Sequence, residues 1–155
     1  MASQRCWLIK ADPEFYSIDD LQRDKRTCWD GIRNYQARNF IRDDMKKGDL
    51  MLVYHSGVEP KGIVGIARVS REAYPDHTAL DPRHVHFDPK STKAEPIWQM
   101  VDVEFVEKFP EIITLAALKK IPAIKTMPLL QRGQRLSVMP IDPAHFEIVR
   151  KLGHG

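Results

Sequence analysis

The 155 residues (17.9 kDa) have the size of one globular domain. The content of 43% hydrophobic and 29% charged residues excludes a disordered chain, a collagen and a coiled coil, and no apolar run approaches the roughly 20 residues that cross a bilayer. Lys and Arg (24) exceed Asp and Glu (21) by three, which is too small an excess to define a strongly basic protein. The cysteines form no metal spacing or disulfide framework, and the N-terminus has no apolar export segment. We therefore expect a cytoplasmic protein with reduced thiols.

The first half of the chain alternates short strands with helices. Residues 6–10 predict a strand, and residues 17–21 predict a short helix capped by Ser17. The clearest helix covers residues 34–47, because apolar residues recur at helical spacing at Ala37, Phe40, Ile41 and Met45. Lys46 and Lys47 would fill its last turn, with Gly48 as the residue that ends it.

The second half predicts more strand. Residues 49–55 and 63–69 form a hairpin, residues 74–91 an irregular surface loop, and residues 97–106 an alternating strand. Residues 114–120 predict a short capped helix. A last helix begins at Asp142 and Pro143 and would bury Phe146, Val149 and Leu152. The pattern predicts an α+β domain with a curled sheet of five or six strands and helices at its ends.

Residues 29–39, WDGIRNYQARN, combine aromatic, amide and guanidinium side chains at a junction between loop and helix. If Asn34 caps the helix, then Asn34, Arg38 and Arg42 form one polar row near Trp29. This arrangement suits a nucleotide, because an aromatic ring stacks on a base and guanidinium groups bind phosphate. The alternative is a salt-bridged helix surface around a packed tryptophan.

Residues 112–141 are a second candidate contact, because this stretch has five cations and no carboxylate. Such a segment is a mild basic patch suited to phosphate contacts, or an ordinary solvated face. The cations are Lys119, Lys120, Lys125, Arg132 and Arg135.

Two histidine motifs allow several interpretations. His55 and Ser56 can hydrogen-bond a heterocycle or serve the structure; serine hydrolysis is disfavoured, since neighbours on an extended chain point to opposite sides and no G-x-S-x-G motif occurs. His84 and His86, near Asp81 and Asp88, could bind a metal, but a third ligand at characteristic spacing is missing. Solvated loop residues are therefore the preferred interpretation, and we predict no metal site and no cofactor.

Short motifs along nearly the whole chain resemble the EVE domain family. They are WLIK (7–10), YSIDDL (16–21), WDGIRNYQARN (29–39), MKKGD (45–49), YHS (54–56), GIVG (62–65), YPD (74–76), DPKS (88–91), VDV (101–103) and RLSV (135–138). The resemblance implies one EVE domain over residues 1–155, with a PUA-like fold related to YTH and ASCH domains. That fold is a curled mixed sheet or pseudo-barrel of five to six strands with flanking short helices.

The resemblance also implies a reader rather than an enzyme, which binds DNA or RNA by accepting a flipped and modified base. We also expect a monomer that does not contact a membrane. The residues that match the family's motif in such a pocket are Trp29, Asn34, Tyr35, Arg38, Asn39, His55 and Ser56, with Lys10, Arg135 and Ser137 at its edge. Because one stacked ring only offsets the cost of flipping, a second wall is needed, and Tyr35 and Trp98 are candidates for it or for simple core packing.

Two alternative functions remain open. One is an RNA- or nucleotide-processing enzyme of ASCH-like type, with His55 as general base and Asp30 or Asp102 as its partner, although no spacing indicates a matched acid and base. The other is a small-ligand sensor whose pocket takes a free metabolite.

Overall fold

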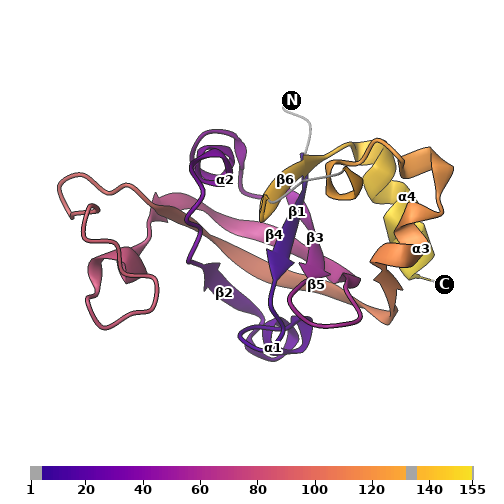
Figure 1. Ribbon diagram of the computed structural model, residues 1–155, viewed down its shortest axis with the longest axis horizontal. Coiled ribbons are helices and arrows are strands. Elements are labelled where there is room, and N and C mark those ends of the chain that lie inside the picture. The colour runs from indigo at the N-terminus through magenta and orange to yellow at the C-terminus, as the bar shows by residue number, and fades with distance from the viewer. Residues whose placement is uncertain (1–4, 132–135, 155) are drawn as a thin grey trace.

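A mixed sheet organises the chain in the computed structural model, which describes residues 5–131 and 136–154 (Figure 1). Its strands are β1 (Cys6–Ala11), β2 (Arg26–Trp29), β3 (Leu50–His55), β4 (Gly62–Pro75), β5 (Gln99–Thr114) and β6 (Val138–Ile141). They lie in the order β2-β5-β4-β3-β1-β6, with β1 and β3 parallel and the other neighbours antiparallel. No pairing joins β2 to β6 in the described chain, so the curled six-stranded sheet is not closed into a barrel. The predicted α+β class is confirmed.

The helices are short, and side-chain caps set where several of them begin. They are α1 (Ile18–Asp24), α2 (Tyr35–Asn39), α3 (Leu115–Lys119) and α4 (Pro143–Gly153), with a π-helix η1 (Phe40–Asp44) and 3-10 turns η2 (His77–Leu80), η3 (Pro122–Ile124) and η4 (Pro128–Leu130). Ser17 caps α1 and Asp142 caps α4, both as predicted. No helix of the described residues combines the length and the apolar character that crossing a membrane requires.

The helix predicted over residues 34–47 begins as expected but ends early. The Asn34 side chain accepts a hydrogen bond from the backbone N–H of Ala37 at 3.0 Å, which caps α2. The segment then widens into η1, where the Met45 N–H donates to the Phe40 carbonyl, and Met45 itself is extended. The buried Asp49 carboxylate explains this end, because it accepts hydrogen bonds from the Lys46 N–H and from the Trp7 indole, both at 2.9 Å. These bonds hold residues 46–49 in a turn rather than in a helix.

The sheet extends further than the sequence predicts. β4 and β5 are longer than the strands predicted at 63–69 and 97–106. They stay paired over this length because their backbones hydrogen-bond to each other on both sides of several bulges. β2 and β6 have only four residues each, too few for a period-2 pattern to reveal them. The predicted burial of Leu152 is wrong: its side chain is 46% exposed, and Gly153 lies against Phe109 instead.

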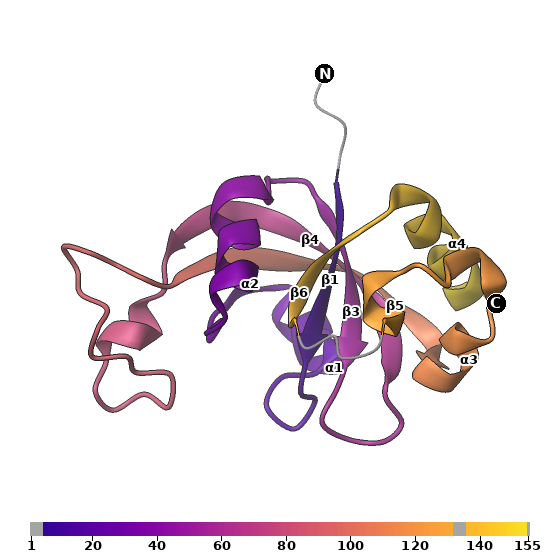
Figure 2. The same ribbon diagram turned by 45° about the horizontal axis from the view of Figure 1, so that its top comes forward.

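Two hydrophobic clusters use the two faces of the sheet. Trp7, Ile9 and Met51 belong to one cluster, whereas Leu8 and Leu52 belong to the other, as the alternation along β1 and β3 requires. Figure 2 shows α2 over one part of the sheet and α3 and α4 grouped at another end. The loop between β4 and β5 projects from the end opposite α3 in both views (Figures 1 and 2).

Candidate functional site

A cavity of about 640 Å³ opens where three segments distant in sequence meet. These are the β1–α1 loop, the end of β2 and the tip of the β4–β5 loop. Its volume lies within the range of about 300–1,000 Å³ that is typical of ligand pockets. Its lining residues are Lys10, Ala11, Asp12, Phe15, Tyr16, Thr27, Cys28, Trp29, Asp30, His84, Val85 and His86.

Trp29 supplies an aromatic wall of this cavity. It is the last residue of β2, where pairing with Val101 of β5 holds its backbone. Its half-buried indole packs against the core cluster that contains Trp7 and meets the Tyr16 ring edge to face, at 6.1 Å between centroids and 85° between planes. The core cluster and the Tyr16 ring therefore hold the indole in place, and its remaining surface lines the cavity.

Two neighbouring rings complete the aromatic character of the cavity. The Tyr16 hydroxyl donates to Asp24 at 2.9 Å, and burial together with this bond raises the pKa of Tyr16 to about 12, so the phenol stays neutral. Phe15 is 85% exposed at the cavity rim, so its ring is open to a ligand. Phe15 and Tyr16 therefore add two rings to the lining that contains the Trp29 indole.

The β4–β5 loop is tied to the motif that contains Trp29. The buried Asp76 carboxylate accepts hydrogen bonds from the Gly31 N–H at 2.9 Å and from the Arg33 guanidinium at 3.0 Å. Burial alone would raise the pKa of Asp76, but its hydrogen bonds with Thr78, Gly31 and Arg33 more than offset this and lower it. Arg33 also donates to the carbonyl of His86 at 2.7 and 3.1 Å. The loop tip is thereby held against the segment that directly follows β2.

Gly31 is required for this close approach. Its φ is +81°, and a Cβ built on it would lie 2.5 Å from the His86 ring. The imidazole therefore rests directly on the glycine backbone, where no larger residue fits.

Lys10 and Ser137 lie together, as the sequence analysis places them. The Lys10 N–H donates to the Ser137 carbonyl at 2.9 Å, and Lys10 lines the cavity. Burial, with a smaller contribution from Lys61, lowers the pKa of Lys10, so a bound anion would relieve a partly desolvated cation. Arg135, the third predicted edge residue, lies outside the described residues.

Four predicted residues gather on the surface of α2 instead of at this cavity. Asn34 caps the helix, and Tyr35 is 57% exposed, with the Arg38 guanidinium 4.9 Å from its ring centroid. Arg38 donates to the Asn39 side chain and to the Ile97 carbonyl. None of the four is among the residues that line the cavity.

Trp98 packs as a structural residue. It is 5% exposed, its indole N–H donates to Asp88 at 2.6 Å, and its ring lies 5.0 Å from that of Tyr35. The Arg33 guanidinium covers it at 5.4 Å. Of the two interpretations of Trp98, core packing matches this geometry.

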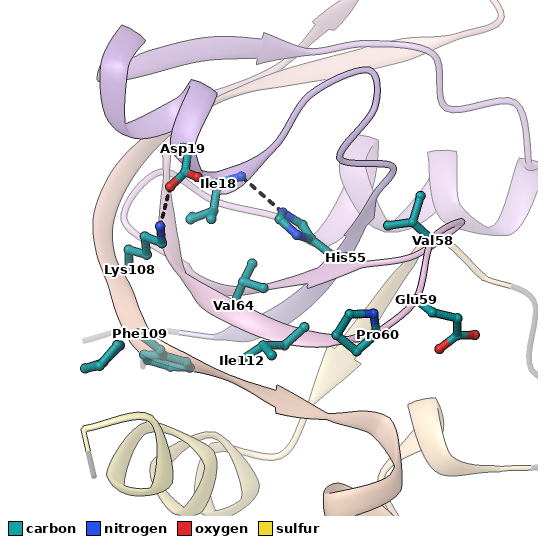
Figure 3. A pocket seen from close by; sticks show the side chains of 11 residues that line it. Ile18, Asp19, His55, Val58, Glu59, Pro60, Val64, Lys108, Phe109 and Ile112 are labelled. Atoms are coloured by element: carbon teal, nitrogen blue, oxygen red, sulfur yellow. Dashed lines mark hydrogen bonds and ion pairs between the residues drawn. The ribbon is translucent and has the colours of Figure 1, made fainter.

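His55 lines a second cavity, of about 310 Å³, beyond α1 (Figure 3). Its Nε2 accepts a hydrogen bond from the Ile18 N–H at 3.1 Å, and burial lowers its pKa. The carboxylates whose charges act on His55 are Asp19 and Asp12, whereas Asp102 accepts from the Tyr74 hydroxyl. Neither Asp30 nor Asp102, the two carboxylates proposed as partners of His55 as a general base, is among the groups that act on it.

Ser56, the neighbour of His55, lies apart from the first cavity as well. Its N–H donates to the Ala11 carbonyl at 2.8 Å, and it is not among the residues that line that cavity. Of the eleven predicted site residues, the structure brings Trp29 and Lys10 to the cavity wall, with Ser137 beside Lys10.

Sequence reasoning missed most of the cavity wall. Asp12, Phe15 and Tyr16 lie on the β1–α1 loop and Thr27 lies on β2, and only the tertiary structure brings these segments together. One local signal was available, because Phe15 stands in a polar turn where an apolar ring has no core to join.

The lysines of the basic segment lie elsewhere. Lys119 ends α3, which is at the opposite end of the sheet from the β4–β5 loop (Figure 1). Lys119 and Lys120 are exposed there. Phosphate binding by this segment remains a prediction. Lys119 and Lys120 would act at a distance from the cavity, whereas Arg132 and Arg135 lie outside the described residues.

Comparison with known proteins shows close relatives along almost the full chain. The sequence model of the EVE domain matches residues 5–152. Human thymocyte nuclear protein 1 is 42% identical over a 164-residue alignment that covers 94% of this chain and 72% of the relative. A crystal structure from Pseudomonas putida superposes with a TM-score of 0.92 at 45% identity, covering 96% of this chain and 99% of that one.

A second solved structure is human THYN1 in complex with DNA that contains 5-methylcytosine. It has a TM-score of 0.89 at 39% identity and covers 98% of this chain and 99% of that chain. The ASCH protein of Zymomonas mobilis, at 13% identity and a TM-score of 0.54, shares the fold alone. The motif order, the six-stranded sheet and the family match agree: this chain belongs to the EVE domain family.

Proposed function

We propose that this EVE domain reads nucleic acid by accepting a flipped, modified base into the cavity beside Trp29. The main support is the Trp29 indole, which packs against the core and yet lines the cavity. The cavity lining also includes the Lys10 ammonium group, two carboxylates and two imidazoles. The relative human THYN1, solved with DNA containing 5-methylcytosine, favours DNA and a modified cytosine as the ligand.

The energetics require more than Trp29. Extracting a base from a duplex costs a few kcal/mol, and stacking on one aromatic ring returns about 1–3 kcal/mol. Phe15 at the rim offers a second apolar contact. Lys10 would add attraction to phosphate, and Thr27 and Asp30 would add hydrogen bonds to the base edge.

Burial of the methyl group alone can produce only a small preference for a methylated base. Burying one methyl group contributes about 0.8 kcal/mol, which is roughly a fourfold preference. A stronger preference requires a slot that is poorly filled without the methyl group.

An affinity panel tests the proposal. Fluorescence anisotropy would compare duplexes with one central cytosine or 5-methylcytosine, their single strands and the matching RNA, each at two salt concentrations. We expect the methylated DNA to bind best and Trp29→Ala to weaken it by roughly 5- to 150-fold, the equivalent of one lost stack. Tyr35→Ala is the matched control, because Tyr35 is an exposed ring outside the cavity lining. Equal affinities of wild type and the Trp29 variant for every oligonucleotide would refute it.

We infer further that binding occurs without catalysis. The support is the position of His55, whose Nε2 accepts the Ile18 N–H and which has neither Asp30 nor Asp102 as a partner. Incubation of the protein with end-labelled methylated DNA and RNA is expected to return both unchanged. A product that wild type forms and that His55→Ala does not would support the enzyme instead.

A further inference from the structure

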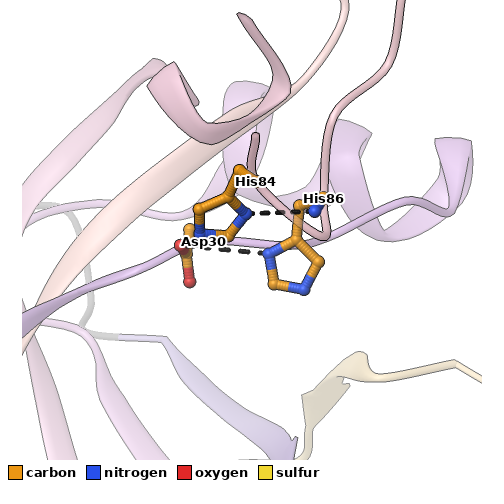
Figure 4. Close-up of side chains that lie close together, drawn as sticks. All are labelled: Asp30, His84 and His86. Carbon is orange, nitrogen blue, oxygen red and sulfur yellow. Dashed lines mark hydrogen bonds and ion pairs between the residues drawn. The ribbon is translucent and has the colours of Figure 1, made fainter. Parts of the chain in front are cut away.

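The side chains of Asp30, His84 and His86 converge at the wall of the cavity (Figure 4). One ligand atom from each lies within 4.8 Å of the others. We propose that these three residues bind a divalent transition-metal ion of the zinc class through two imidazole nitrogens and one carboxylate oxygen. The sequence spacing offered only two of these ligands, and the fold supplies the third.

Contacts outside the cluster bring Asp30, His84 and His86 together. Asp30 directly follows β2, while His84 and His86 belong to the β4–β5 loop. Arg33 joins the two segments by its hydrogen bonds to Asp76 and to the His86 carbonyl. Gly31 lets the His86 ring lie against the backbone beside Asp30. These contacts restrict the positions of Asp30 and His86 in the absence of an ion.

One ring nitrogen of each histidine faces Asp30 (Figure 4). The His86 backbone N–H donates to Nδ1 of His84 at 3.0 Å, which leaves Nε2 of His84 turned toward Asp30 (Figure 4). Nδ1 of His86 is buried, has no hydrogen-bond partner among the described residues and lies 4.0 Å from Asp30 Oδ2. A buried, unsatisfied ring nitrogen is costly, and an ion between it and the carboxylate would satisfy both groups.

Small adjustments would bring the ligands to bonding distance. Ligands bound at about 2.0–2.2 Å to a tetrahedral ion lie about 3.4 Å from one another, so the present separations would shrink by at most about 1.4 Å. Bonding through Nε2 of His84 also moves the ring proton to Nδ1 and gives up the hydrogen bond from His86. The irregular loop that carries both histidines can absorb these shifts, since neither lies in a helix or strand.

The ligand set indicates the class of ion. Imidazole with carboxylate suits zinc and other first-row transition metals, whereas magnesium and calcium prefer oxygen ligands throughout. Three protein ligands leave at least one coordination position free, and all three line the same cavity. A nitrogen or oxygen atom of a guest in the cavity could take that position. Asp88, near the histidines in sequence, accepts instead from the Trp98 indole.

Cobalt titration of the untagged protein, stripped with a chelator, tests the site without nucleic acid. We expect one equivalent of Co²⁺ to bind with a visible d–d absorption and to quench tryptophan fluorescence, Zn²⁺ to displace it, and Mg²⁺ to have no effect. Asp30→Asn and His84→Gln should each weaken Co²⁺ binding by at least about 10-fold, because losing a ligand costs no less than losing a group that supports one. His77→Gln, an exposed histidine of η2, is the control and should bind as wild type.

The proposal is overturned if wild type shows no saturable Co²⁺ absorption, or if both variants bind Co²⁺ as tightly as wild type. Circular dichroism checks that each variant is folded, and wild-type titration decides the question if neither is. Because no oligonucleotide is present, failure of this test leaves base reading untouched.

Discussion

Arg33 and Asp76 form an ion pair of 3.0 Å in which the Asp76 side chain is fully buried and the Arg33 side chain is 24% exposed. The pair joins the segment after β2 to the start of the β4–β5 loop. Arg33 also donates twice to the His86 carbonyl, once to the Ile32 carbonyl at 2.9 Å and once to the Thr78 hydroxyl at 3.4 Å. Together with the hydrogen bond from the Gly31 N–H to Asp76, this guanidinium connects two of the three segments that line the cavity beside Trp29.

Asp76→Asn should therefore destabilise the protein and disorder the cavity. Leaving the partly buried Arg33 without its charged partner is expected to cost on the order of 3–5 kcal/mol. Urea unfolding measures the loss. Arg42→Gln, which breaks an exposed pair with Asp43, is the control and should cost no more than about 1 kcal/mol. Equal effects of the two substitutions would show that the pair does not hold the loop.

Gly31→Ala and Gly48→Ala separate backbone strain from steric contact. Both glycines have positive φ, but a Cβ at position 48 meets nothing within 4 Å, whereas one at position 31 meets the His86 ring. We expect both variants to lose about 1 kcal/mol from strain, with a larger loss at position 31. Only Gly31→Ala should also weaken DNA binding in the anisotropy assay. Matching losses of stability and affinity would contradict the close approach of His86.

The stability of the protein should fall in mild acid because of His55. Its pKa is lowered by burial, and its Nε2 accepts the Ile18 N–H, so the folded state requires the neutral ring. In the unfolded chain His55 binds a proton at a higher pH than it does in the folded protein. The contribution of His55 to the free energy of unfolding is therefore fully present above pH about 6.5, and it is lost as the pH falls through its lower folded pKa. Urea unfolding at several pH values between 7.5 and 5 should show this slope in wild type and a smaller one in His55→Phe. His77→Gln, which replaces an exposed histidine of η2, is the control for the loss of a titratable ring.

Lys10 should contribute to the salt dependence of DNA binding more than Lys119 does. Lys10 lines the cavity, while Lys119 lies on α3 at the other end of the sheet. Removing one phosphate contact lowers the slope of log K against log salt by about 0.9. We expect this change for Lys10→Gln and none for Lys119→Gln, measured by anisotropy from low to moderate salt. The reverse result would place the DNA on the basic segment instead.

Local signals in the sequence predicted what local interactions determine. Ser17, Asn34 and Asp142 cap their helices because a side-chain oxygen needs only the backbone N–H groups two or three residues ahead. The alternation along β1 and β3 is likewise visible in a few consecutive residues.

Nonlocal contacts decided where the predicted elements stop. The helix predicted over residues 34–47 ends early because Asp49 binds both Lys46 and Trp7, a residue more than forty positions away. β2 exists only through its pairing with β5, and four residues hold no pattern that reveals it.

The sequence by itself determined the fold class and the starts of α1, α2 and α4, because each depends on neighbours in the chain. Only the tertiary structure decided that Phe15, Trp29 and His86 share one cavity while Tyr35 and His55 do not. The reason is physical: the direction of a side chain follows from its local backbone, but which distant side chains it meets depends on strand pairing and on buried pairs such as Arg33 with Asp76.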